Sequence, residues 1–149
     1  MAWQGQLLES DAQIAALLTA LRRIAVLGMR GAEHAHRPAY YVPETLQRMG
    51  LQIVPVPVHD LKATQMLGQP VYHRLADIPG ELDLVDVFRR PMELAPHLPD
   101  ILAKRPAAVW LQTGIRHDAF AERLVREGIA VVQDRCLMVE YRRHHKAAG

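Results

Sequence analysis

The chain has 149 residues, half of them hydrophobic, and a formal net charge of only +2. This length is typical of one domain that folds without disulfides or metals, and the hydrophobic content excludes an intrinsically disordered protein. The single cysteine excludes a disulfide framework and favours a reducing compartment. We therefore expect one cytoplasmic domain spanning residues 1–149, and we expect it to bind neither nucleic acid nor a membrane.

The first predicted element is a helix at residues 11–22. Ser10 and Gln13 form a capping-box pattern at its start. Apolar residues then recur at the spacing of one helical face, at Ile14, Leu17, Leu18 and Leu21. Acidic residues precede this apolar stretch, which reverses the order found in a secretory signal. We expect the helix to pack on a sheet, and the alternative is a helix that binds a protein partner.

A glycine loop follows the first predicted strand. Residues 24–28 read Ile-Ala-Val-Leu-Gly, which is typical of a buried parallel strand that ends at a glycine. Gly28 and Gly31 can adopt positive φ and allow a ligand to approach the backbone closely, and Pro38 suits a first helical turn. A strand, a glycine loop and a helix N-terminus in this order can bind phosphate. The full dinucleotide motif has three glycines, so an ordinary strand-to-helix turn is the alternative.

Helices and strands alternate along the rest of the chain. The predicted helices lie at residues 39–49, 91–104, 118–127 and 135–143, and the predicted strands at 52–56, 82–88, 107–111 and 129–132. Pro43 either starts or kinks the first of these helices, Pro96 and Pro99 interrupt the second, and Asp134 caps the last. Residues 61–80 are irregular apart from one helical turn at 75–78. A basic tail at about 142–149 is expected to be solvated and partly frayed.

This alternation predicts the fold class. Strands that alternate with helices form an α/β fold in three layers, here a five-stranded parallel sheet with helices on both faces. Ligands of such sheets bind beyond the carboxyl ends of the strands. The binding site is therefore expected among the residues that directly follow each strand.

Glycine, proline, arginine and small polar residues are concentrated at these positions. They suit a purine stacked over Pro57, with phosphates held by backbone N–H groups and arginines. Turns also favour such residues, so a set of ordinary turns is the alternative. The candidate binding residues are Gly28, Met29, Arg30, Gly31, Arg37, Pro38, Val56, Pro57, His59, Lys62, Phe88, Arg89, Arg90, Gln112, Thr113 and Gly114.

Seven segments resemble a known family. They are residues 24–28, 37–40, 54–56, 76–79, 85–90, 109–115 and 132–136. Val85-Asp86-Val87-Phe88-Arg89-Arg90 and Val132-Gln133-Asp134-Arg135-Cys136 are the more specific in combination. The chain is similar, over roughly residues 20–142, to small stand-alone coenzyme A (CoA)-binding proteins and to the CoA-binding domain of the succinyl-CoA ligase alpha subunit. The resemblance implies a Rossmann-like fold with CoA or an acyl-CoA bound at the rim.

Two features bear on the choice of cofactor. The family often has hydroxyl residues where this chain has Arg30 and Ala39, so Arg30 is expected to replace a hydroxyl in phosphate contacts. NAD binding needs a carboxylate near the end of the second strand. This chain has prolines there, followed by His59 and Lys62, which favour the 3′-phosphate of CoA. Asp60 is the carboxylate that argues for NAD, and NADP also fits the charge.

Several other residues have two interpretations each. His34 and His36 have the spacing of a metal pair, but structural sites need four ligands, so we predict no metal. Cys136 is either a reactive thiol or a small buried apolar residue. Asp86, inside an apolar strand, either orients an arginine, which we favour, or caps a turn. Trp110 is expected in the core.

No catalytic set is recognisable, so we expect a binding, carrier or sensor module for CoA. The alternatives are an NADP-dependent reductase, a subunit of an acyl-CoA ligase completed by a partner, and a regulatory partner protein. A protein partner or a homo-oligomer is also compatible with the sequence.

Overall fold

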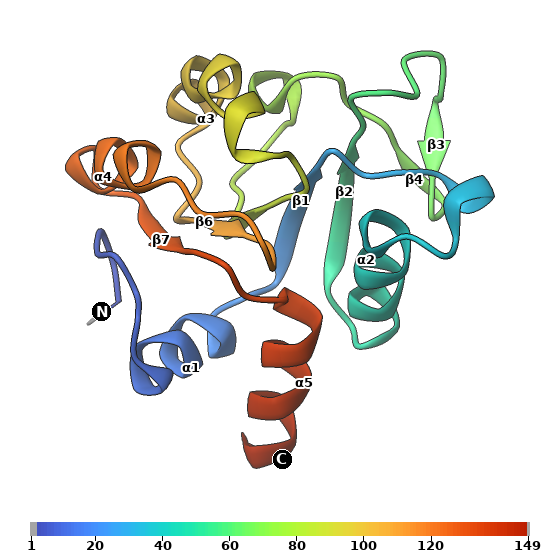
Figure 1. Cartoon of the computed structure of the whole chain (residues 1–149). Coiled ribbons are helices and arrows are strands. Elements are labelled where there is room, and N and C mark those ends of the chain that lie inside the picture. Colours follow the sequence, from blue (N-terminus) through green and yellow to red (C-terminus); the bar gives the residue numbers. More distant parts are fainter. Residues whose placement is uncertain (1–2, 149) are drawn as a thin grey trace.

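A parallel sheet runs through the centre of the computed structural model, which describes residues 3–148 (Figure 1). Its five strands lie in the order β2-β1-β5-β6-β7. Their bounds are β1 Arg23–Leu27, β2 Gln52–Val56, β5 Leu84–Val87, β6 Ala108–Leu111 and β7 Ala130–Val132. All neighbouring pairs are parallel. The predicted three-layer α/β fold is confirmed.

Alternating side chains of the strands enter two separate cores. In β1, Ile24 and Val26 belong to one core, whereas Ala25 and Leu27 belong to the other. Helices α1 (Asp11–Thr19), α2 (Pro38–Arg48) and α5 (Leu137–Ala148) cover the first face, and α3 (Leu98–Lys104) and α4 (Asp118–Arg126) cover the second (Figure 1). Because both faces are covered, the strands are apolar on both sides, as their sequence indicates.

The predictions for two buried strand residues, Trp110 and Asp86, have different outcomes. Trp110 is wholly buried, as expected, and its indole Nε1 donates to the Arg135 carbonyl at 2.7 Å. Asp86 is also wholly buried, but neither carboxylate oxygen has a hydrogen-bond partner among the described residues. The prediction that it orients an arginine is therefore wrong. Burial raises the pKa of Asp86 well above its usual range, because it favours the uncharged form of the carboxyl group.

Prolines are tolerated where the fold provides for the missing N–H group. Pro55 lies in β2, which is an edge strand. Pro43 lies inside α2, which begins at Pro38 and continues to Arg48. Pro43 cannot donate to the carbonyl of Ala39, and that carbonyl accepts the backbone N–H of Arg30 at 3.1 Å instead. Pro43 therefore neither starts nor ends the helix, and the carbonyl it leaves free binds the loop after β1.

Several element boundaries differ from the predicted ones. Helix α1 ends at Thr19 rather than at residue 22. Residues 61–80 contain a short hairpin of β3 (Gln65–Met66) and β4 (Gln69–Pro70) as well as the expected helical turn at Leu75–Asp77. The predicted helix at 91–104 is interrupted: two 3₁₀ turns, at Pro91–Glu93 and Ala95–His97, precede α3.

Asp134 does not cap α5. It adopts a left-handed φ of 57°, and its carboxylate accepts the backbone N–H of Gly114 at 2.6 Å. The backbone N–H of Leu137, at the start of α5, donates instead to Oε1 of Gln112 at 3.0 Å. Helix α5 extends to Ala148. Residues 142–148, expected as a frayed tail, are thus the last turns of this helix.

Candidate functional site

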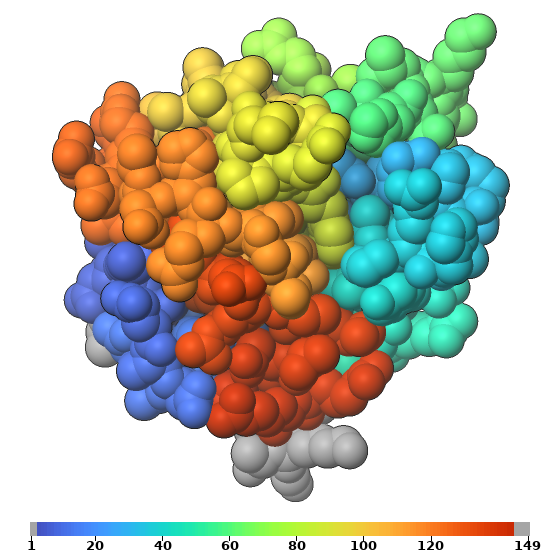
Figure 2. Space-filling view, viewed as in Figure 1, coloured from blue at the N-terminus to red at the C-terminus, as the bar shows by residue number. Residues whose placement is uncertain are grey.

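The larger of two neighbouring cavities lies beyond the carboxyl ends of β1, β5 and β6. It has a volume of about 1170 Å³, and the N-terminal ends of α2 and α5 border it. Figure 2 shows its mouth between the red atoms of α5, the cyan atoms of α2 and the yellow segment after β5. Most of the predicted binding residues line it. They are Gly28, Arg30, Arg37, Pro38, His59, Phe88, Arg89, Arg90, Gln112, Thr113 and Gly114.

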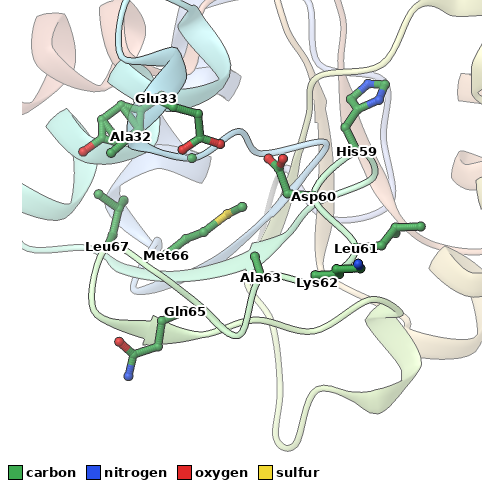
Figure 3. A pocket seen from close by; sticks show the side chains of 12 residues that line it. Ala32, Glu33, His59, Asp60, Leu61, Lys62, Ala63, Gln65, Met66 and Leu67 are labelled. Carbon is green, nitrogen blue, oxygen red and sulfur yellow. The ribbon is translucent and has the colours of Figure 1, made fainter.

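The smaller cavity, of about 820 Å³, lies between the loop after β2 and the loop after β1. Of the predicted residues, Gly31, His59 and Lys62 line it, and His59 lines both cavities. Figure 3 shows the side chains of Glu33, Asp60 and Met66 reaching this cavity from three different segments. The two cavities therefore meet near His59.

Three predicted residues line neither cavity. Met29 is wholly buried in the core, and Val56 is buried in β2. Pro57 is also buried. Its ring is thus not an exposed surface on which a purine can stack in this structure.

Gly28 is required by the contact between two strand ends. Its φ is +87°, and a Cβ atom there would lie 2.5 Å from the backbone oxygen of Phe88. The glycine therefore allows the chain after β1 to approach the chain after β5, which is a requirement of the fold itself. Gly31 differs from the prediction, because its φ is −83° and needs no glycine. A Cβ atom at Gly31 would contact the Glu33 carboxylate at 2.7 Å.

Arg89 is the most buried of the four arginines that line the larger cavity. Its side chain is only 13% exposed, and its Nη2 lies 3.5 Å from the Glu93 carboxylate. Its Nε donates to Nε2 of His97 at 3.2 Å. Burial, and then the nearby guanidinium of Arg89, lower the pKa of His97, which keeps the imidazole neutral and able to accept this hydrogen bond.

Arg90 is adjacent in sequence but differs in its environment. Its side chain is 76% exposed, and it forms an ion pair with Glu93 at 3.4 Å. The backbone N–H of Arg90, followed by Arg89 and the Arg90 side chain, lowers the pKa of Glu93. Glu93 therefore stays ionised and forms ion pairs with both arginines.

The start of α2 provides a second anion-binding element. Its N-cap residue, Arg37, has no side-chain hydrogen bond to the helix. Pro38 has no N–H group, and the N–H groups of Tyr40 and Tyr41 donate to the Arg37 carbonyl, so the N–H of Ala39 is the one left without a partner among the described residues of this turn. Ala39, in the first turn, lines the larger cavity. This free N–H group and the positive end of the helix dipole attract an anion at this position.

Gln112 and Gly114 have mainly structural roles. They line the larger cavity, but the Gln112 side chain accepts from Leu137 and the Gly114 N–H donates to Asp134. Their polar groups thus hold the start of α5 beside the cavity.

Sequence reasoning missed part of the apolar wall and most of the smaller cavity. Ile115, Met138 and Val139 line the larger cavity, and Glu33, Met66 and Leu67 line the smaller one, and none of them was predicted as a binding residue. Cys136 also lines the larger cavity and Asp60 the smaller one. Cys136 is partly exposed and is a free thiol. Cys136 and Ile115 lie in segments 132–136 and 109–115, which resemble the family, and this was the signal that pointed to the wall. The start of α5 reaches the cavity because β7 neighbours β6 in the sheet.

The histidine pair has other contacts. Nε2 of His34 lies 2.8 Å from Nη2 of Arg30, and His36 lines the larger cavity. Among the described residues, no three histidine, cysteine or carboxylate side chains gather as a metal would require. Within residues 3–148 there is also no helix with the length and hydropathy needed to cross a membrane.

Comparison with known families decides the classification. The sequence model described as the CoA binding domain matches residues 22–142. The chain belongs to the CoA-binding domain family. This CoA-binding domain is 30% identical to YneT of Bacillus subtilis, an uncharacterized protein, over 133 residues that cover 89% of this chain and 94% of YneT.

Solved structures of small stand-alone proteins have the same fold. A Thermus thermophilus protein, cell-free ID.343, has a TM-score of 0.84 and 42% identity, covering 91% of this chain and 99% of that one. A hypothetical protein from Pyrococcus horikoshii OT3 has a TM-score of 0.82 and 26% identity, covering 92% and 93% of the two chains. The CoA-binding domain therefore accounts for nearly the whole of these relatives.

Proposed function

We propose that this CoA-binding domain binds free CoA or an acyl-CoA at the carboxyl-end rim of its sheet and acts as a non-catalytic binding, carrier or sensor module. The observation that carries the proposal is the larger cavity, where four arginines and the uncapped start of α2 surround one space. The arginines are Arg30, Arg37, Arg89 and Arg90. CoA carries a diphosphate and a 3′-phosphate, and arginine binds phosphate through paired N–H donors.

The two cavities together suit the two ends of CoA. The diphosphate lies against Arg37, Arg89 and the first turn of α2, where charge-assisted hydrogen bonds are available. The adenosine extends past His59 into the smaller cavity, where Lys62 offers a cation to the 3′-phosphate. The pantetheine arm extends in the other direction, along the apolar wall formed by Ile115 and Val139.

The environment of Cys136 favours a binding role over catalysis. A nucleophilic cysteine is activated by a base within hydrogen-bond reach. In the part of the chain that the structure describes, no histidine or carboxylate is hydrogen bonded to the Cys136 thiol. A free thiol also fits a reducing, cytoplasmic location, which we include in the proposal.

A specific observation favours a second candidate, an NAD(P)-dependent reductase. Asp60 lies in the smaller cavity, close to the end of β2. Dinucleotide-binding folds place a carboxylate near this point to accept hydrogen bonds from the ribose hydroxyls. The CoA proposal is preferred because the family and the arginines of the larger cavity both support it.

Native mass spectrometry of the purified protein discriminates between these functions. We expect an added mass equal to CoA or to an acyl-CoA, either retained from the host cell or gained on incubation with CoA. An added mass equal to a nicotinamide cofactor would support the reductase. A protein that binds neither, at ligand concentrations up to the millimolar range, would contradict both proposals.

A further inference from the structure

One ion pair stands at the junction of the two cavities. Nε of Arg30 and Oδ2 of Asp60 lie 3.9 Å apart, with side-chain exposures of 18% and 28%. Arg30 lines the larger cavity, Asp60 lines the smaller one, and His59, next to Asp60, lines both. A ligand that occupies both cavities therefore passes this pair.

The two facing atoms of the pair lack hydrogen-bond partners. Nε of Arg30 and Oδ2 of Asp60 are both buried, yet neither has a hydrogen-bond partner among the described residues. Their separation of 3.9 Å exceeds hydrogen-bond distance. A buried N–H group without an acceptor is costly, so an anion that supplies an acceptor would be bound in preference to the present arrangement.

The position of Arg30 itself is fixed by the backbone. The backbone N–H of Arg30 donates to the Ala39 carbonyl, which is available because Pro43 has no N–H to donate to it. Its Nη2 contacts the ring of His34. The guanidinium is thus held where the loop after β1 meets the start of α2, which is the place at which a diphosphate would lie.

We propose that Asp60 is a specificity-determining residue that competes with the ligand's phosphates for Arg30. This inference rests on the proposed binding of CoA. In the unliganded protein the Asp60 carboxylate neutralises Arg30, and on binding the diphosphate takes its place. Because Asp60 occupies Arg30, it lowers the affinity for a ligand whose phosphates need that cation relative to a less charged ligand that does not. The pair thereby keeps the affinity for CoA low enough that bound CoA dissociates and exchanges.

The test is a set of calorimetric titrations with CoA on the parent protein and on Asp60→Asn, Glu33→Gln, Arg30→Gln and the double variant Arg30→Gln/Asp60→Asn. Asp60→Asn should bind CoA about fivefold more tightly, the upper range for one partly exposed ion pair. Glu33→Gln is the matched control. It removes an acid from the same cavity, but that acid is 63% exposed and is paired with His34 rather than Arg30. It should change the affinity less than twofold.

The double variant decides whether Arg30 carries the effect. In the Arg30→Gln background, Asp60→Asn should give no gain. A gain that persists without Arg30, an equal gain in Glu33→Gln, or a loss of affinity in Asp60→Asn would each overturn the competition. A parent protein that binds no CoA would reject the proposed function, and the role of the pair with it. Normal CoA binding by the parent with an unchanged Asp60→Asn variant would reject the competition alone.

Discussion

The two cavities at the carboxyl end of the sheet share His59 but differ in charge. The larger one has Arg30, Arg37, Arg89 and Arg90 against one acid, Glu93, whereas the smaller one has Glu33 and Asp60 against one cation, Lys62. The loops after β1 and β5 provide the arginines, and the loop after β2 provides Asp60 and Lys62. This difference supports our assignment of the diphosphate to the larger cavity and of the adenosine to the smaller one, where Lys62 is the cation available to the 3′-phosphate.

The largest expected effect is on the free energy of unfolding, at Gly28, which lines the larger cavity and is required by the fold. Gly28→Ala introduces a Cβ atom 2.5 Å from the Phe88 oxygen at a φ of +87°, whereas Gly128 has a similar φ of +82° and open space around it. Gly128→Ala should lower the free energy of unfolding by roughly 1–2 kcal/mol, through its left-handed backbone alone. Gly28→Ala should lower it by about 1–3 kcal/mol more, because the chains must separate.

Urea unfolding of the two glycine variants measures this difference. Equal losses of stability would show that the close contact between the chains after β1 and β5 does not constrain residue 28.

The next largest effect separates two adjacent arginines of the larger cavity. Arg89 is 13% exposed and held by Glu93 and His97, whereas Arg90 is 76% exposed. Arg89→Gln should lower the affinity for CoA at least tenfold, because a charge-assisted hydrogen bond contributes about 1.5–3 kcal/mol. Arg90→Gln should lower it less than about threefold, as expected for an exposed charge. Titration calorimetry of both variants checks the prediction, and a larger loss in Arg90→Gln would contradict it.

A smaller effect is expected in the smaller cavity. Lys62 is exposed there, and we assign it to the 3′-phosphate. Lys62→Gln should weaken CoA binding by about threefold, and it should leave the affinity for dephospho-CoA unchanged, since that ligand lacks the 3′-phosphate. Equal weakening for both ligands would place Lys62 elsewhere on the ligand.

The smallest effect is a pH dependence of stability through His97. Burial and Arg89 lower its pKa below the usual 6.5, although Asp100 and Glu93 partly oppose the shift. The unfolded chain therefore binds this proton more readily, and the free energy of unfolding falls as the pH drops below about 6.5. Thermal melting at pH 7.5 and pH 5.5 should show a smaller decrease for His97→Gln than for the parent. An equal decrease in both would contradict the assignment.

The fold was largely predictable, because apolar runs and their alternation with helices depend on local sequence. The exceptions depend on tertiary partners. Helix α2 continues through Pro43 because Arg30 supplies a donor to the Ala39 carbonyl. Asp134 fails as a cap because it binds Gly114, on the loop after the neighbouring strand β6. No local pattern could have shown either contact.

The candidate site was predictable only in part. Residues such as Gly28 and Arg89 directly follow strands, so the topology alone brings them to one rim. Sequence could not show that Arg89 is held and Arg90 exposed, because Glu93 and His97 decide this through two 3₁₀ turns. It also could not show that Val139 reaches the cavity, since that depends on how α5 packs beside β6.

The central claim is that the cavities bind CoA in preference to a nicotinamide dinucleotide. Calorimetric titration of the parent protein with CoA, dephospho-CoA and NAD, at one salt concentration, tests this most directly. We predict affinities in that order, with removal of the 3′-phosphate weakening binding about tenfold, which corresponds to about 1.4 kcal/mol. Equal affinity for CoA and dephospho-CoA would remove the role assigned to His59 and Lys62, and tighter binding of NAD would contradict the account.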